Sequence, residues 1–159
     1  MALIVVGISD VQASREPQDV FITYSLGSCI GVTAYDPAVR VGGMIHYMLP
    51  LSQIAPDKAA ARPAMFADTG VPALLNALLA LGAAKSRLVV KAVGGAQLMD
   101  QHKLFNIGER NFLILRKILW KNNILIKASE VGGMMSRTLR LELDTGRVIV
   151  KSSHGEVEL

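Results

Sequence analysis

Two apolar runs joined by a short turn constrain the fold of this chain more than any other feature. The runs Cys29–Tyr35 and Val41–Leu49 flank the segment Asp36-Pro37-Ala38-Val39-Arg40, whose aspartate and proline are typical of a turn. Apolar runs on both sides of such a turn predict an antiparallel β-hairpin. The pairing register of this hairpin decides which side chains of its two strands share a face.

Further strands and helices are predicted along the rest of the 159 residues. An apolar stripe at helical spacing predicts a helix that is capped at Asp68-Thr69 and ends at Gly82. A second helix starts at Asn106 or Gly108 and ends at Asn122-Asn123. We expect a mobile loop at Ser52–Arg62, and strands at Leu3–Ile8, Val20–Ser25, Arg87–Val93, Ile124–Ser129, Ser136–Leu143 and Arg147–Lys151.

These elements amount to about seven strands and two or three helices, without a regular alternation of strand and helix. That pattern predicts an α/β (α+β) class: a layered fold of packed mixed β-sheets with helices outside. The length suits one domain spanning residues 1–159.

Composition argues against several classes of protein. Hydrophobic residues make up 51% of the chain, yet no stretch approaches the roughly 20 apolar residues of a membrane span. The first residues do not resemble a signal peptide and a single cysteine cannot form an internal disulfide, so we expect a cytoplasmic protein. The 17 Lys and Arg residues are scattered among 13 Asp and Glu, and aromatic residues are few, which argues against nucleic-acid binding. A mildly basic surface suits an acidic protein partner equally well.

No metal or other cofactor is expected. One cysteine and three well-separated histidines do not give the spacing of a metal site. Two of these histidines, His102 and His154, lie in polar surroundings and are expected at the surface. The third, His46, lies in the second run of the hairpin.

Cys29 is the best candidate for a nucleophile, since the only cysteine follows a flexible glycine in Leu26-Gly27-Ser28-Cys29. A hairpin centred between Ala38 and Val39 places His46 opposite Gly31, with Cys29 two residues further along on the same face. A centre at Pro37-Ala38 places Cys29 directly opposite His46, whereas a slip of one residue puts them on opposite faces. A nearby imidazolium would favour the reactive thiolate. Gly31, which has no side chain, is expected to leave space for a substrate.

A third group is needed to orient the imidazole. The Thr23 hydroxyl, on the preceding strand, is the first choice. Asp36 is the charged alternative, but it lies in the turn, at the far end of the hairpin from His46. Backbone N–H groups near Gly27, Ser28 and Cys29 are candidates for an oxyanion hole. From composition alone, a buried structural cysteine is the commoner outcome, and structural roles for His46 and Thr23 remain the alternative.

The segments Thr23–Val32 and Gly42–Pro50 resemble the CheD family of chemoreceptor glutamine deamidases. The likeness continues in order through Phe66-Ala67-Asp68, Lys91–Ala96, Asn106–Asn111, Gly132-Gly133 with Arg137, and Asp144-Thr145-Gly146. The departures are Tyr24-Ser25, more polar than usual, and Phe66, where tyrosine is common.

The resemblance implies a catalytic triad of Cys29, His46 and Thr23 that hydrolyses glutamine side chains of methyl-accepting chemotaxis receptors. It also implies a fold similar to the deamidase domain of cytotoxic necrotizing factor toxins, no cofactor, and the CheC phosphatase as a partner. The alternatives are a binding module that regulates CheC, with Cys29 incidental, or another acyl transfer by the same thiol, such as transglutamination or ester hydrolysis.

Overall fold

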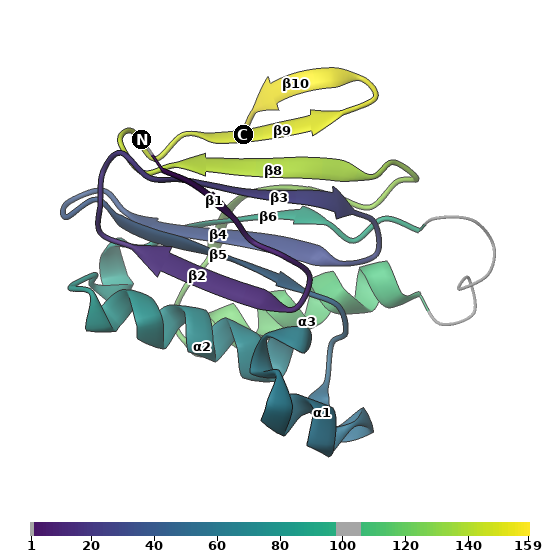
Figure 1. The fold of residues 1–159 in the computed structure, drawn as a ribbon. Coiled ribbons are helices and arrows are strands. Elements are labelled where there is room, and N and C mark those ends of the chain that lie inside the picture. The colour runs from purple at the N-terminus through teal and green to yellow at the C-terminus, as the bar shows by residue number, and fades with distance from the viewer. Residues whose placement is uncertain (1, 98–105) are drawn as a thin grey trace.

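Two mixed β-sheets pack face to face, and helices cover the outer face of one of them (Figure 1). The structure is a computed structural model that describes residues 2–97 and 106–159. Sheet A contains β1 (Leu3–Val5), β3 (Val20–Leu26), β8 (Arg137–Glu142), β9 (Val148–Ser152) and β10 (Gly155–Glu158), in that order. Sheet B contains β2 (Asp10–Ser14), β5 (Val41–Tyr47), β4 (Ile30–Asp36), β6 (Val89–Gly94) and β7 (Ile126–Val131). The predicted α+β class with mixed sheets is confirmed.

The predicted hairpin forms β4 and β5 in the interior of sheet B. All residues of both strands are buried, because one face packs on sheet A and the other on the helices. The two strands are antiparallel with Gly31 opposite His46, the first of the registers predicted from the turn. The register with Cys29 directly opposite His46 is therefore wrong, and so is the register with the two on opposite faces.

Helices α2 (Ala67–Ala80) and α3 (Ile107–Lys121) lie side by side against sheet B (Figure 1). The boundaries of α3 confirm the prediction, but α2 begins before the predicted cap. Its N-cap is Phe66, without a side-chain cap. The carboxylate of Asp68 instead accepts hydrogen bonds of 2.9 Å from both the N–H and the Oγ of Ser52. It therefore joins α2 to the segment that follows β5.

One local prediction is wrong, and two strands were not predicted. The expected loop at Ser52–Arg62 contains a 3₁₀ turn (Ser52–Ile54) and helix α1 (Pro56–Ala61), where a proline at the first helical position precedes an alanine-rich run. Strands β2 and β10 had no predicted counterpart. Both are short, polar edge strands without an apolar run, and they form by hydrogen bonding to the neighbouring strand.

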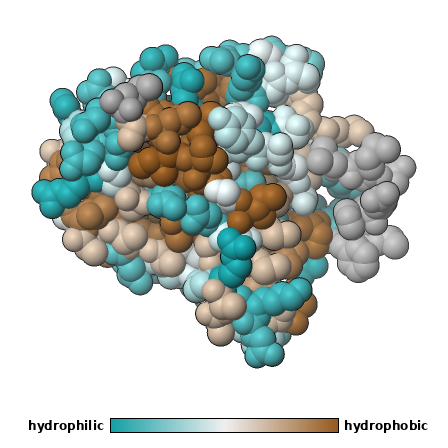
Figure 2. All heavy atoms as spheres, in the orientation of Figure 1, coloured by the Kyte–Doolittle hydropathy of each residue, from teal (hydrophilic) through white to brown (hydrophobic). Residues whose placement is uncertain are grey.

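The hydrophobic core has two layers. One lies between sheet B and the helices, with Ile45, Leu74 and Leu115 among its fully buried members. The other lies between the sheets, where Phe21, Met44 and Leu139 meet. Apolar side chains also gather at the surface over β1, where Leu3 and Val5 are more than half exposed (Figure 2).

Candidate active site

Cys29 lies in the loop between β3 and β4, directly before the first residue of β4. Its free thiol is partly buried and packs against the core layer between the sheets, as Met44 does from β5. Met44 and His46 are two residues apart on β5 and so point to the same side. Cys29 and His46 therefore lie on one face of sheet B, directed toward sheet A.

A hydrogen bond between the sheets orients His46. The Thr23 hydroxyl on β3 lies 2.7 Å from Nδ1 of His46 and donates its single hydrogen to the carbonyl oxygen of Val6, 2.6 Å away. Thr23 must then accept from Nδ1, which places the ring proton there. Nε2 is consequently a free lone pair, and it has no hydrogen-bond partner in the part of the chain that the structure describes.

Burial keeps both candidate groups neutral at physiological pH. It raises the pKa of the Cys29 thiol, although the residue's own backbone N–H opposes this. It also lowers the pKa of His46 to about 4, because the imidazole is 1% exposed. The thiolate–imidazolium pair expected from the sequence is therefore not the resting state. The arrangement fits a neutral base that takes the thiol proton during attack.

The loop that carries Cys29 is held by the segment after β6. The N–H of Gly95 donates to the Cys29 carbonyl at 2.9 Å, and the N–H of Ala96 donates to the Gly27 carbonyl at 2.8 Å. A Cβ at Gly94 would collide with the Cys29 carbonyl oxygen. Within residues 2–97 and 106–159, the N–H groups of Gly27 and Ser28 have no backbone acceptor outside the strands, whereas the N–H of Cys29 interacts with its own sulfur. The N–H groups of Gly27 and Ser28 are available to an incoming oxyanion.

Asn111 of α3 also holds both strands of the site. Its fully buried side-chain Nδ2 donates to the carbonyls of Ser28 and Met48, each at 2.9 Å. The backbone carbonyl of Asn111 accepts from the Tyr47 hydroxyl at 2.6 Å. Asn111 thus fixes the residue before Cys29 to the segment that follows His46. From the sequence, Asn111 entered only as part of a motif. The sequence signal that could have revealed it is a polar residue placed one helical turn before Leu115, among the buried residues of α3.

Arg137 supports the neighbouring loops from sheet A. Its side chain is 5% exposed and pairs with Glu130 at 2.9 Å. It also donates to the carbonyls of Gly94 at 3.1 Å and Gly132 at 2.9 Å. Arg137 therefore joins β6, which holds the Cys29 loop, to β7. Like Asn111, it had been noted from the sequence without a role.

The expectation about Gly31 is wrong, and the charged alternative to Thr23 is excluded. Gly31 does not leave room for a substrate, because a Cβ there would lie 2.8 Å from Leu139 and 3.0 Å from Leu26. Asp36 does not orient the imidazole. It pairs with Arg87 at 2.9 Å and accepts the N–H of Ala84, at the other end of the hairpin.

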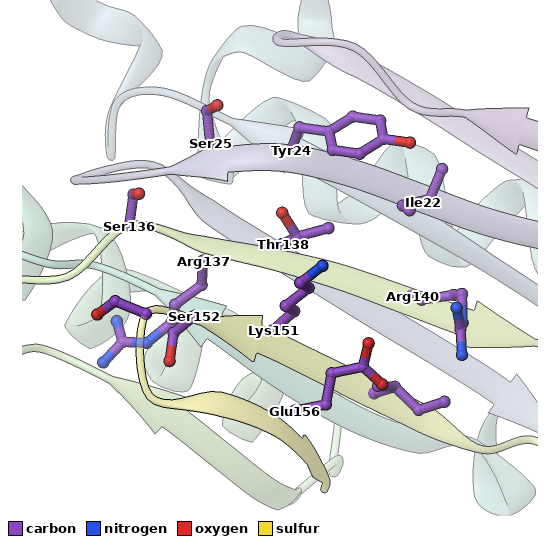
Figure 3. Close-up of a pocket in the computed structure, with 12 residues that line it drawn as sticks. Ile22, Tyr24, Ser25, Ser136, Arg137, Thr138, Arg140, Lys151, Ser152 and Glu156 are labelled. Atoms are coloured by element: carbon purple, nitrogen blue, oxygen red, sulfur yellow. The ribbon is translucent and has the colours of Figure 1, made fainter.

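A separate groove of about 500 Å³ runs over the outer face of sheet A, between Tyr24, Arg140 and Lys151 (Figure 3). None of Thr23, Cys29 and His46 lines it.

No helix of the described residues is long and apolar enough to cross a membrane. In the same part of the chain, no three His, Cys, Asp or Glu residues are grouped so that they could hold a metal ion. His154 is exposed, as expected, whereas His102 lies outside the described residues.

Comparison with known proteins gives consistent matches. The family model described as "CheD chemotactic sensory transduction" matches residues 48–152. The chain is 50% identical over 155 residues to a probable chemoreceptor glutamine deamidase CheD 1 of Syntrophus aciditrophicus, covering 98% of this chain and 97% of the relative. It is 48% identical over 159 residues to a probable chemoreceptor glutamine deamidase CheD of Solibacter usitatus, covering 100% and 94%. A third such relative, from Anaeromyxobacter dehalogenans, is 47% identical over 152 residues, covering 96% of each chain. This chain belongs to the CheD family.

Proposed function

We propose that this protein is a cysteine-dependent protein-glutamine glutaminase of the cytoplasm, which converts glutamine side chains of chemotaxis receptors to glutamate and releases ammonia. Relatives that align over nearly its whole length are named as probable chemoreceptor glutamine deamidases. One geometric observation carries the chemistry. Thr23 fixes the His46 proton on Nδ1, so the ring presents an unprotonated Nε2 on the face that it shares with Cys29.

The neutral pair sets the order of proton transfers. As Sγ of Cys29 attacks the glutamine Cδ, the thiol proton passes to Nε2 of His46. The carbonyl oxygen becomes an oxyanion that the N–H groups of Gly27 or Ser28 stabilise. The C–N bond then breaks, and the imidazolium gives its proton to the departing nitrogen, which leaves as ammonia. A thioester remains on Cys29.

Hydrolysis of the thioester uses the same base. His46 takes a proton from water, the resulting hydroxide attacks the thioester carbon, and the C–S bond breaks to release glutamate. The proton returns to Sγ of Cys29, which restores the thiol. The sum is one amide and one water converted to one carboxylic acid and one ammonia. No metal or organic cofactor takes part in this scheme.

Two further points belong to the same proposal. The packed mixed sheets with helices on one side suit a fold like that of the cytotoxic necrotizing factor deamidase domain. CheC is proposed as a protein partner, on the basis of the family resemblance alone. A role in which the chain only regulates CheC is the competing outcome.

Mass spectrometry of receptor peptides tests the proposal. Peptides are compared after incubation of a chemotaxis receptor with the wild type, with Cys29→Ala and with Ser153→Ala, a control at an exposed serine. We expect a glutamine-to-glutamate change with the wild type and the control, and none with Cys29→Ala. Deamidation that survives Cys29→Ala would contradict the enzymatic role of the thiol. Intact receptor with all three proteins would favour the binding module.

A further inference from the structure

The exposed side of α3 carries large apolar side chains that are not part of the hydrophobic core. Leu113 is 50% exposed and Trp120 is 70% exposed, while Leu125, between α3 and β7, is 79% exposed. Leu113 and Trp120 are seven residues, or about two helical turns, apart, so they lie on one side of α3. An exposed surface of this kind marks an interaction site more often than single exposed apolar residues do.

These side chains line a groove of about 510 Å³ between α3 and the start of β7. We call this the α3–β7 groove, defined by Leu113, Arg116, Lys117, Trp120, Ile124, Leu125 and Ile126. Ile124 is buried and forms part of its base. A concave apolar surface with exposed walls fits a ridge of side chains, such as one face of a helix, better than it fits a flat surface.

The charge around the α3–β7 groove has one sign. Arg116 and Lys117 line it, Lys121 and Lys127 flank it in the sequence, and all four are exposed. No ion pair is recorded for any of the four among the described residues. The lining contains no acidic residue. Two copies of this surface would repel each other, which argues against self-association through it.

We propose that the α3–β7 groove docks an acidic amphipathic helix of a partner protein. The apolar side chains of that helix would enter the groove, and its carboxylates would lie beside Arg116 and Lys117. A helix packs in this way along the Leu113–Trp120 stripe through interleaved ridges. The surface is separate from Cys29. Asn111, on the buried side of α3, contacts the Cys29 loop, whereas the groove lies on the exposed side of α3, from Leu113 to Trp120, which is about 14 Å beyond Asn111 along the helix axis. A docked partner therefore leaves the thiol accessible, and this proposal does not depend on the deamidase function.

Trp120 provides a direct measurement, because it is the only tryptophan in the chain. The full chain is titrated with a synthetic helical peptide that has leucines at positions i, i+3, i+4 and i+7 and glutamates elsewhere, and tryptophan emission is recorded. We expect a saturable blue shift that weakens as salt increases. A peptide with lysine in place of each glutamate is expected to give no shift.

Matched variants distinguish docking in the groove from attraction of the acidic peptide by the net positive charge of the protein. Arg116→Glu combined with Lys117→Glu reverses the charge beside the groove and is expected to weaken binding of the acidic peptide by at least about tenfold. Lys151→Glu with Arg15→Glu makes the same change in net charge at two exposed residues outside the groove and is expected to leave affinity within about twofold.

Two results would overturn the proposal. The first is an unchanged emission with the acidic peptide. The second is an equal loss of affinity in both double variants, which would reflect net charge alone. If the first result is accompanied by a blue shift with phosphatidylglycerol vesicles, the surface is assigned to an anionic membrane. Circular dichroism of each variant confirms that it is folded.

Discussion

Replacing Thr23 by valine tests the orientation of His46 with almost no change of shape. Thr23 is fully buried, and its hydroxyl makes two hydrogen bonds, of 2.6 Å to the Val6 carbonyl and 2.7 Å with His46 Nδ1. Thr23→Val leaves both partners buried without a hydrogen bond. Each such group costs about 1–3 kcal/mol, so the free energy of unfolding should fall by about 2–6 kcal/mol. For a domain of this size, that is a fall in Tm of roughly 5–20 °C.

The catalytic loss has a separate cause. Without Thr23 as acceptor, the imidazole proton is free to move to Nε2, and that tautomer cannot take the thiol proton. General base catalysis contributes about 10²–10⁴-fold, which is the expected loss in kcat for Thr23→Val. Thr23→Ser keeps the hydroxyl and serves as the matched control, with activity expected within about tenfold of the wild type.

Ammonia release from a receptor substrate, measured below the Tm of each variant, gives the rates, and ¹⁵N NMR of the ring reports the His46 tautomer. Valine and serine variants that are equally active, or equally inactive, would refute this account of Thr23.

Three further predictions concern the same site. Because burial lowers the pKa of His46 to about 4, Nε2 stays unprotonated well below the usual pKa of 6.5, and kcat/KM for ammonia release should decline only near pH 4; a decline near 6.5 would contradict a buried neutral base. Asn111→Asp keeps the shape but removes both donors to Ser28 and Met48, so urea denaturation should show a loss of about 2–6 kcal/mol, together with a lower kcat. Gly31→Ala should reduce the free energy of unfolding by about 1–3 kcal/mol through overpacking, and an unchanged Tm would mean that the adjoining leucines yield freely.

The hairpin could be predicted because its information is local. A turn between two apolar runs limits the hairpin to a few registers, and the one that forms, with Gly31 opposite His46, puts Cys29 and His46 on one face. Similarly, the stripe of α3 and its flanking asparagines gave the limits of that helix.

What could not be predicted depends on contacts between distant parts of the chain. Strands β2 and β10 are polar and become ordered by pairing with a neighbouring strand. The depth at which sheet A covers His46 sets its pKa, and no pattern within β5 reveals that depth. Asn111 reaches carbonyls 83 and 63 residues away along the chain. The filling of the space at Gly31 likewise comes from sheet A.

Capture of the covalent intermediate tests the central claim most directly. The wild type is mixed with a glutamine-containing receptor peptide, quenched in acid within the first turnover and analysed by intact-mass and peptide-level mass spectrometry. We predict an adduct equal to the peptide less one ammonia, attached to Cys29 and released by hydroxylamine, as a thioester requires. Ammonia release at the wild-type rate with no adduct on Cys29, or with an adduct on another residue, would contradict nucleophilic attack by this thiol.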